Sequence, residues 1–314
     1  MSKTTTLTEH LGHFVKIKQQ LGYRFIDNQY MLQSFARFAE DRHETVIQAN
    51  TVLEWAAAGG VSRNRRVKRL HTVHAFAAWV HAEDARHEVP HREALGPRSH
   101  RRPSPYLVSL EEIQALLMAA LSIEPEGTIT PLTWHHLFGL IAVTGLRISE
   151  ALSLTLEDLT ADGLIIHDTK FRKSRMVALH PTTWKALNRY LVVRHKAKTQ
   201  DDHLFVLAST GRPPSKNYTE IIFRRLAEQT GIRKPGAPRG PTPHSLRHSF
   251  AVRSIENLVP EADPSRHMLA LATYLGHANV SDTYWYLEST PALLQGIADA
   301  TERSHAQQCG GSHD

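Results

Sequence analysis

The stretch YLGHANVSDTYWYLEST, Tyr274–Thr290, places three consecutive aromatic residues shortly after a Gly-His pair. A glycine after an apolar run is typical of a helix C-terminus, so one helix is expected to end at Gly276, immediately before His277. Tyr284 and Tyr286 follow on the next predicted helix, where residues two apart point about 200° away from each other. Only one tyrosine can therefore face a site that contains His277, and the other is expected to pack.

A second candidate stretch is HSLRH, which spans His244–His248. His244 and Arg247 are three residues apart, so they are neighbours on one face of a helix. The pair suits a phosphate group, because a guanidinium donates to two non-bridging oxygens while an imidazole donates a hydrogen bond or a proton. The same spacing also occurs by chance in chains that bind no phosphate, so the pair alone decides nothing.

Two further cationic residues lie at predicted turns. Arg147, in the segment TGLRISEAL, follows a glycine that is expected to end an apolar helix, and its alternative role is a salt bridge with Glu150. Lys170 lies near the tip of a β-hairpin predicted over Leu164–Leu179, where an ammonium group can enter a DNA groove and donate a proton. An ordinary turn lysine is the alternative for Lys170, and Lys173 competes with it for a special role.

The composition favours a folded protein with an anionic partner. Hydrophobic residues make up 41% and charged residues 22% of the 314 residues, and the net charge is +6 with a pI near 9.5. Basic residues gather in runs without acids, which fits contacts to a phosphate backbone, although a solvated basic face is the alternative. The candidate DNA contacts are Arg63, Arg65, Arg66, Lys68, Arg69, Arg101, Arg102, Arg172, Lys173 and Arg175.

The cysteine content and hydropathy exclude several classes. Cys309 is the single cysteine of the chain, so no disulfide framework or thiolate metal site is expected. No apolar run approaches the roughly 18 residues that a membrane-spanning helix needs, and the first residues lack the hydrophobic region of a signal peptide. We therefore expect a cytoplasmic protein without a membrane partner, whose polyanion is nucleic acid.

The pattern along the chain predicts two domains. Apolar residues at helical spacing predict four short helices within residues 1–88, the fourth with a basic first half. Residues 89–105 are rich in proline and arginine and lack apolar periodicity, which predicts a linker. Residues 106–303 predict a larger helical domain with one small sheet, and residues 304–314 predict a disordered tail.

Taken in order, these segments resemble the signature of the tyrosine recombinase (phage integrase) family. The family pattern is an arginine in a TGLR segment, a hairpin lysine, H-x-x-R, L-G-H, and a tyrosine nine residues after that last histidine. Tyr286 lies nine residues after His277, so the resemblance selects it over Tyr284. The resemblance implies a catalytic set of Arg147, Lys170, His244, Arg247, His277 and Tyr286.

The hairpin turn departs from the family pattern. Residues Thr169–Lys173 read TKFRK, where relatives often have glycines around the lysine. The choice between Lys170 and Lys173 therefore stays open, and its distance from Arg147 in the sequence favours Lys170. Glu150 matches the acidic position of the family, which implies that it orients the site rather than reacting.

The resemblance also implies a fold and a reaction. The fold would be mainly α with a small antiparallel β-sheet: an N-terminal helical, SAM-like core-binding domain and an α+β integrase-type catalytic domain. The reaction would be Xer-like site-specific recombination, of a transposon-borne or chromosomal kind, through a 3′-phosphotyrosyl bond to Tyr286 without metal, ATP or another cofactor. Expected partners are double-stranded DNA with inverted core-type sites, further copies in a synaptic tetramer, and partner recombinases or accessory proteins. The protein is expected to associate with the nucleoid, and Pro291–Arg303 is expected to dock onto a neighbour or onto its own domain.

Three other functions compete with this interpretation. A type IB topoisomerase shares the chemistry but relaxes supercoils without exchanging partners. A DNA-binding regulator without catalytic activity is a second alternative. A metal protein is the third, because the chain has 21 histidines, but they are scattered, and the adjacent His135 and His136 are expected to point apart on a helix.

Overall fold

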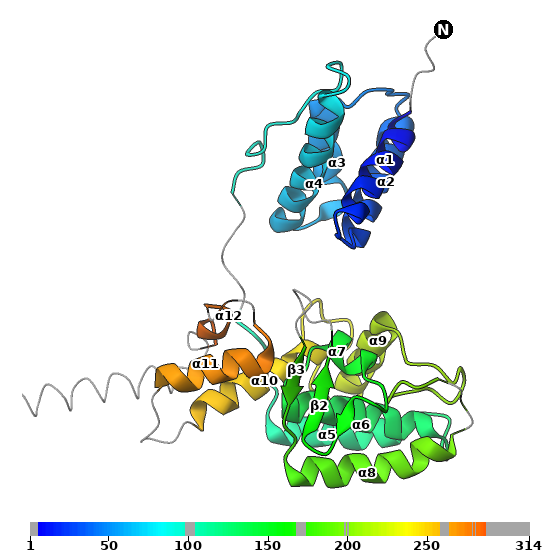
Figure 1. Cartoon of the computed structure of the whole chain (residues 1–314), viewed down its shortest axis with the longest axis vertical. Coiled ribbons are helices and arrows are strands. Elements are labelled where there is room, and N and C mark those ends of the chain that lie inside the picture. The colour runs from blue at the N-terminus through cyan, green and yellow to red at the C-terminus, as the bar shows by residue number, and fades with distance from the viewer. Residues whose placement is uncertain are drawn as a thin grey trace, which may run out of the picture. The chain divides into compact units, whose positions relative to one another are not determined.

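The computed structural model describes residues 6–97, 104–167, 174–197, 199, 201–257, 264–277, 279 and 281–286. The chain divides into two compact units, Met1–Pro103 and Ser104–Asp314 (Figure 1). This division falls within the proline- and arginine-rich stretch of residues 89–105.

The first unit is helical throughout its described core and encloses a cluster of aromatic side chains. Phe14, Phe35, Trp55 and Phe76 are buried together there, which gives each helix one apolar face. The elements are α1 (Leu7–Gln20), α2 (Ile26–Glu40), α3 (Ala49–Ala57), the short 3₁₀ helix η1 (Ala58–Gly60) and α4 (Arg63–His81).

The second unit combines helices with a small sheet. Strands β1 (Leu159–Thr160), β2 (Gly163–Ile166) and β3 (Arg175–Val177) form an antiparallel sheet in the order β1-β2-β3. The helices are α5 (Leu110–Leu121), α6 (Ile129–Thr144), α7 (Ile148–Ser153), α8 (Pro181–Lys196), α9 (Lys216–Gln229), α10 (Pro243–Glu256), α11 (Pro264–Leu275) and α12 (Ser281–Tyr284). The expected fold class, mainly α with a small antiparallel sheet, is confirmed.

Helix α6 lies at the centre of the larger core and ends where the site begins. Trp134 and Phe138 on this helix are buried and stack on each other. Gly145 ends the helix with φ 63°, a conformation that favours glycine, and a side chain there would meet the Phe250 ring at 2.5 Å. The tight approach of α10 to this turn brings Arg147 close to the site residues that α10 carries.

A second, smaller core joins α10 and α11 to the segment at the end of the described chain. Its buried members include Val252, Leu271, Leu275 and Tyr286. Gly276 ends α11 with φ 67°, and a side chain there would meet the Arg175 guanidinium at 2.5 Å. Both helices thus end at a glycine, as predicted. The absence of a glycine side chain leaves room for Phe250 at the first turn and for Arg175 at the second.

Candidate active site

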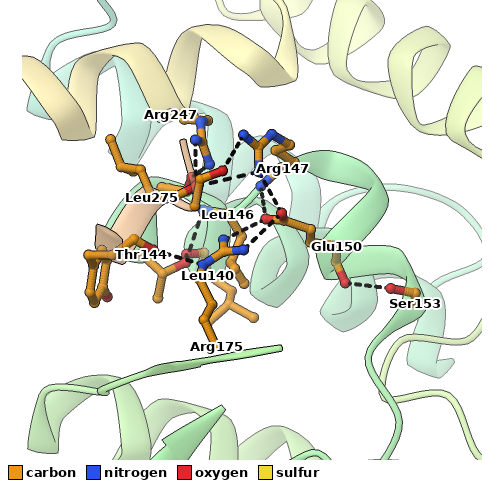
Figure 2. A network of polar contacts seen from close by, with 12 residues as sticks. Leu140, Thr144, Leu146, Arg147, Glu150, Ser153, Arg175, Arg247 and Leu275 are labelled. Atoms are coloured by element: carbon orange, nitrogen blue, oxygen red, sulfur yellow. Dashed lines mark hydrogen bonds and ion pairs between the residues drawn. The ribbon is translucent and has the colours of Figure 1, made fainter. Parts of the chain in front are cut away.

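Arg147 immediately precedes α7 and bridges two segments that are distant in the sequence. Its backbone N–H and its Nη1 donate to the Glu150 carboxylate at 2.9 and 2.8 Å. Its Nη2 donates to the Gly276 carbonyl oxygen at 2.9 Å, and its Nη1 makes a longer contact of 3.5 Å with the Leu275 carbonyl oxygen (Figure 2). The expected salt bridge with Glu150 and a position in the predicted site are therefore compatible.

Glu150 holds two arginines at once. Arg175, at the start of β3, donates from Nη1 and Nη2 to the two Glu150 oxygens at 3.1 and 2.8 Å. Burial alone would raise the pKa of Glu150, but the hydrogen bonds and charges of Arg175 and Arg147 outweigh it and lower that pKa to about 2. Glu150 is therefore ionised at neutral pH and fixes both guanidinium groups.

Arg175 is held by hydrogen bonds within the protein. Its side chain is 11% exposed, and its Nε donates to the Tyr274 carbonyl oxygen at 2.9 Å. The nitrogens of its guanidinium are thus directed at Glu150 and at the end of α11. These hydrogen bonds tie β3 to α7 and α11, and the expected contact of Arg175 with DNA stays a prediction.

Arg247, on α10, is the most deeply buried cation of the site. It is 1% exposed, and it donates to the carbonyl oxygens of Gly145 at 2.6 Å and Leu275 at 2.8 Å. Burial, reinforced by the positive charge of Arg147, lowers the pKa of Arg247 to about 10, so it stays cationic at neutral pH. The site therefore contains two adjacent positive charges that backbone carbonyl oxygens hold in place.

His244 lies one helical turn before His248 on α10 and shares its face. The centroids of the two rings are 4.3 Å apart in an edge-to-face arrangement. Partial desolvation of the imidazole by the surrounding protein, and then the charges of Arg247 and Arg147, lower the pKa of His244 to about 4. His244 is accordingly a neutral imidazole at neutral pH, on a residue that remains exposed to solvent.

His277 directly follows Gly276 and faces the tyrosine. Its Nδ1 lies 2.7 Å from the Thr283 hydroxyl, and its ring lies nearly parallel to the Tyr286 ring, with centroids 6.2 Å apart. Burial, with the charges of Arg247 and Arg147, lowers the pKa of His277 to about 4. The Thr283 contact fixes the ring orientation, so His277 forms one wall beside the tyrosine.

Tyr286 is buried with its hydroxyl among these groups. Its residue is 2% exposed, and the hydroxyl lies 3.2 Å from His248 Nδ1 and hydrogen-bonds Arg247. Burial raises the pKa of the Tyr286 phenol, while Arg247 and Arg147 act in the opposite direction. The structure thus brings together Arg147, His244, Arg247, His277 and Tyr286, which the sequence placed in separate segments.

The neighbouring tyrosine differs from its expected role. Helix α12 ends at Tyr284, and that residue is 47% exposed. Tyr286 lies in the turn beyond the helix, where its N–H donates to the Thr283 carbonyl oxygen. The expectation that Tyr284 packs was therefore wrong, because the two tyrosines do not share one continuous helix.

Other predicted residues lie outside the described part of the chain. These are Lys170, Arg172, Lys173, Arg101 and Arg102, together with Pro291–Arg303 and residues 304–314. Their expected roles stay predictions.

The basic residues of α4 divide into two groups. Arg66 Nε donates to the Val61 carbonyl oxygen, and Arg69 Nη1 donates to the carbonyl oxygens of Trp55 and Ala58. These two arginines therefore stabilise the turn between α3 and α4. The remaining members, Arg63, Arg65 and Lys68, are exposed on the same helix, so a ligand can reach them.

Two histidine pairs lie four residues apart, a spacing that metal-ligand pairs on a helix often have. His244 and His248 are one such pair, on α10. His87 and His91 are the other, in the segment HEVPH, but this segment is not helical, and His87 Nδ1 accepts from the Ile47 N–H. Within the described ranges, no group of three or more His, Cys, Asp or Glu residues is arranged to hold a metal ion.

The adjacent histidines of α6 also differ from their expected orientation. His135 and His136 do not point fully apart, since their ring centroids are 4.9 Å from each other. His135 Nδ1 contacts the Leu117 carbonyl oxygen at 2.9 Å, and the His136 ring packs on Tyr190. Both rings therefore belong to the packing of α6 against its neighbours.

Comparison with known proteins identifies the family. The model of the phage integrase family matches residues 108–292. The chain is 34% identical over 309 residues to "Putative integrase/recombinase y4rB" of Sinorhizobium fredii, a match that covers 95% of this chain and 98% of that protein. It is 28% identical over 300 residues to the tyrosine recombinase XerD of Halalkalibacterium halodurans, with 91% and 93% covered. This chain therefore belongs to the phage integrase family of tyrosine recombinases.

Solved structures of similar fold support the same architecture. XerH recombinase in a post-cleavage complex with its palindromic difH substrate matches with a TM-score of 0.63, 20% identity and coverage of 87% of this chain and 78% of that one. The Tn1549 transposon integrase in complex with transposon right-end DNA matches with a TM-score of 0.63, 17% identity and coverage of 93% and 99%. Among the described residues, no helix has both the length and the apolar character needed to cross a bilayer.

Proposed function

We propose that this protein is a site-specific recombinase that cuts and rejoins DNA through a covalent 3′-phosphotyrosyl bond to Tyr286. The observation that carries the proposal is the meeting of Tyr286, Arg247 and Arg147 from three distant segments. Arg247 hydrogen-bonds the phenol oxygen, and both arginines approach the Leu275 carbonyl oxygen. Membership of the family supports the same chemistry.

The reaction is a phosphotransesterification. The Tyr286 oxygen attacks a backbone phosphorus and releases a 5′-hydroxyl, and a hydroxyl from a partner strand later reverses the step at a new junction. The phosphotyrosyl bond retains the free energy of the phosphodiester, so the cycle needs no ATP. Arg147 and Arg247 stabilise the charge that develops on the non-bridging oxygens, a role that suits fixed donors because they need no reorganisation.

The remaining residues divide the proton transfers and the phosphate contacts. His277 hydrogen-bonds the phosphate from beside the tyrosine, and His244 assists proton transfer at the reacting centre. Lys170 protonates the leaving 5′-oxygen. Its sequence position between β2 and β3 and the family resemblance support this role, since Lys170 itself lies outside the described residues.

DNA binding must open the site before cleavage. Arg247 is 1% and Tyr286 is 2% exposed, so a phosphate cannot reach the two groups in the arrangement described above. One contact that occupies Arg247 is the Tyr286 phenol itself. We infer that the end of α11, which supplies the carbonyl oxygens of Leu275 and Gly276, shifts when DNA binds, and that the phosphate then replaces these oxygens as acceptor for the arginines.

The partners follow from the chemistry of strand exchange. The proposed substrate is double-stranded DNA with inverted core-type sites, and two such duplexes are held by a tetramer. In support, one solved structure of similar fold is a lambda integrase tetramer bound to a Holliday junction, with a TM-score of 0.61. The protein would then act at the nucleoid, with accessory proteins or a second recombinase where a site requires them.

The decisive experiment uses a nicked DNA substrate that traps the covalent intermediate. The wild-type protein should form an adduct that denaturing gels resolve, and Tyr286→Phe should form none while its gel-shift affinity for DNA stays unchanged. Tyr284→Phe is the matched control, because it removes an exposed hydroxyl two residues away and should leave the adduct intact. An adduct in Tyr286→Phe together with its loss in Tyr284→Phe would refute the assignment.

An assay of plasmid relaxation and an assay of strand exchange between two matching sites separate recombination from the alternatives. A topoisomerase relaxes one supercoiled plasmid without a specific sequence, whereas a recombinase exchanges strands between two matching sites and assembles on them as a dimer or tetramer. A regulator without activity binds DNA and forms no adduct.

A further inference from the structure

His248 is a half-buried histidine that the chemistry above leaves without a role. It lies on α10 directly after Arg247, and its Nδ1 is 3.2 Å from the Tyr286 hydroxyl. The oxygen of this hydroxyl is the atom that would attack the phosphorus. The position of His248 therefore differs from that of a histidine that only lines the site.

Packing holds the His248 ring in this orientation. The centroid of the His244 ring lies 4.3 Å from that of His248, and the centroids of the Trp285 and Tyr286 rings lie 5.2 and 5.5 Å away. A half-buried ring with these neighbours has few other rotamers available. Nδ1 is thus directed at the tyrosine oxygen by the surrounding side chains.

The hydrogen-bond inventory allows the phenol to donate here. An arginine only donates, so Arg247 meets the phenol oxygen as an acceptor and leaves the phenol proton available. This proton can point to His248 in the tautomer whose Nδ1 carries no hydrogen. Burial and the nearby His244, Arg247 and His277 lower the pKa of His248 to about 3, which keeps the imidazole neutral and able to accept.

We propose that His248 accepts the phenol proton as the Tyr286 oxygen attacks the scissile phosphorus. This inference rests on the proposed function. In the step, the bond between the Tyr286 oxygen and phosphorus forms, the bond between phosphorus and the 5′-oxygen breaks, and the proton moves to His248 Nδ1. The 5′-oxygen takes its proton from the acid assigned to Lys170.

Substrate binding makes this transfer easier than the free protein suggests. Burial lowers the pKa of His248 most, and the charges of His244 and Arg247 lower that pKa further. A bound phosphodiester brings a negative charge beside these groups and so counteracts part of the lowering. The imidazole therefore becomes more basic when the reacting phosphorus is in place. The geometry gives the direct contact with the nucleophile to His248, and His244, whose ring lies against it one turn earlier, assists the proton transfer from beside it.

The test measures the rate of adduct formation on the nicked substrate with three variants. His248→Ala removes the base, and His248→Asn keeps an acceptor near the Nδ1 position that cannot take a proton. His136→Ala is the matched control, because it removes a half-buried histidine on α6 whose ring packs on Tyr190. Gel shifts and thermal melts check that each variant binds DNA and folds.

We expect His248→Ala and His248→Asn both to slow adduct formation by about 10²–10⁴-fold, and His136→Ala to stay near the wild-type rate. Added imidazole should restore part of the His248→Ala rate, because a free base can occupy the vacated space, and it should not help Tyr286→Phe. If His248→Ala does not fold, His248→Asn carries the test. A wild-type rate in His248→Asn would overturn the proposal, since a hydrogen bond alone would then suffice.

A second substrate separates the proton transfer at the Tyr286 nucleophile from the proton transfer at the leaving 5′-oxygen. A bridging sulfur in place of the 5′-oxygen leaves without a proton, so it rescues variants that lack the acid. His248→Ala should stay slow on this substrate, and its rescue would overturn the proposal. If the wild-type protein forms no adduct at all, the proposed function itself fails, whereas an adduct at the wild-type rate in His248→Ala removes only the role of His248.

Discussion

Arg147 and Arg247 donate to the same backbone atom, the carbonyl oxygen of Leu275, at 3.5 and 2.8 Å (Figure 2). Two guanidinium groups that converge on one oxygen repel each other, so other contacts must hold them. Glu150 supplies those contacts for Arg147, and the Gly145 carbonyl oxygen does so for Arg247. The carbonyl oxygen at the end of α11 thus shows that one acceptor can contact both guanidinium groups, as a phosphate group would have to do.

Replacing Arg147 by lysine should impair cleavage although the charge is preserved. An ammonium group cannot donate in two fixed directions to Glu150 and to the Gly276 carbonyl oxygen, so the clamp loses its geometry. We expect adduct formation to fall by about 10²–10³-fold. Arg189→Lys, on the exposed face of α8, is the control, and equal rates for the two variants would contradict the clamp.

The carboxylate of Glu150 should make stability depend on pH in a defined window. Because its folded-state pKa of about 2 lies below its ordinary 4.5, the ionised form stabilises the fold above pH 4.5, and this contribution is lost as the pH falls towards 2. The free energy of unfolding of Glu150→Gln should therefore be lower than that of the wild type by about 1–3 kcal/mol near pH 6. Denaturant titrations should find this difference shrinking between pH 4.5 and 2, and a constant difference would count against the interpretation.

Replacing Gly276 by alanine should destabilise the protein by more than the backbone strain alone, because the new side chain also displaces Arg175. Gly276 and Gly231 both have a positive φ, of 67° and 74°, but only at Gly276 of these two would a side chain meet the Arg175 guanidinium, at 2.5 Å. Gly231→Ala therefore measures the strain alone, about 1 kcal/mol. We expect Gly276→Ala to lower the melting temperature further and to slow adduct formation, and equal melting temperatures would show that Arg175 adjusts freely.

The exposed cations of α4 should contribute to DNA affinity by neutralising phosphates. Alanine at Arg63, Arg65 or Lys68 should weaken binding to all sequences and reduce the slope of log affinity against log salt by about 1 for each phosphate that is no longer neutralised. Arg86→Ala is the control, because that exposed arginine is already paired with Asp84 at 2.7 Å. Gel shifts at several salt concentrations give the slopes, and an unchanged slope in the α4 variants would exclude this role.

The sequence predicted the members of the site better than their environments. Arg147, Arg247 and Tyr286 could be selected because their order and spacing match a family pattern, and both glycine helix ends follow from local backbone chemistry. The role of Arg175 could not be selected, since its ion pair with Glu150 depends on how β3 packs on α7. His248 left one usable signal, its spacing of four residues from His244, but nothing local revealed that it faces the tyrosine oxygen.

The exposure of the two tyrosines shows the limit of helical periodicity. An angle of about 200° between Tyr284 and Tyr286 holds for one continuous helix, but α12 ends at Tyr284. The turn that follows lets Tyr286 enter the small core of α10 and α11, which leaves Tyr284 in solvent. A break in periodicity of this kind goes with the packing of Tyr286 against α10 and α11, which is formed only in the folded protein.

The aromatic ring at Tyr286 serves as interior packing before it serves as a reagent. Each round of strand cutting would have to open the packing around this ring, and that packing lowers the free energy of the idle protein relative to the armed one. Only a duplex that binds the protein with enough affinity can offset that difference, so a DNA of the wrong sequence is released before it is cleaved. Fidelity would then reside partly in how well the protein is packed, and variants that loosen the α10–α11 core should become less selective cutters.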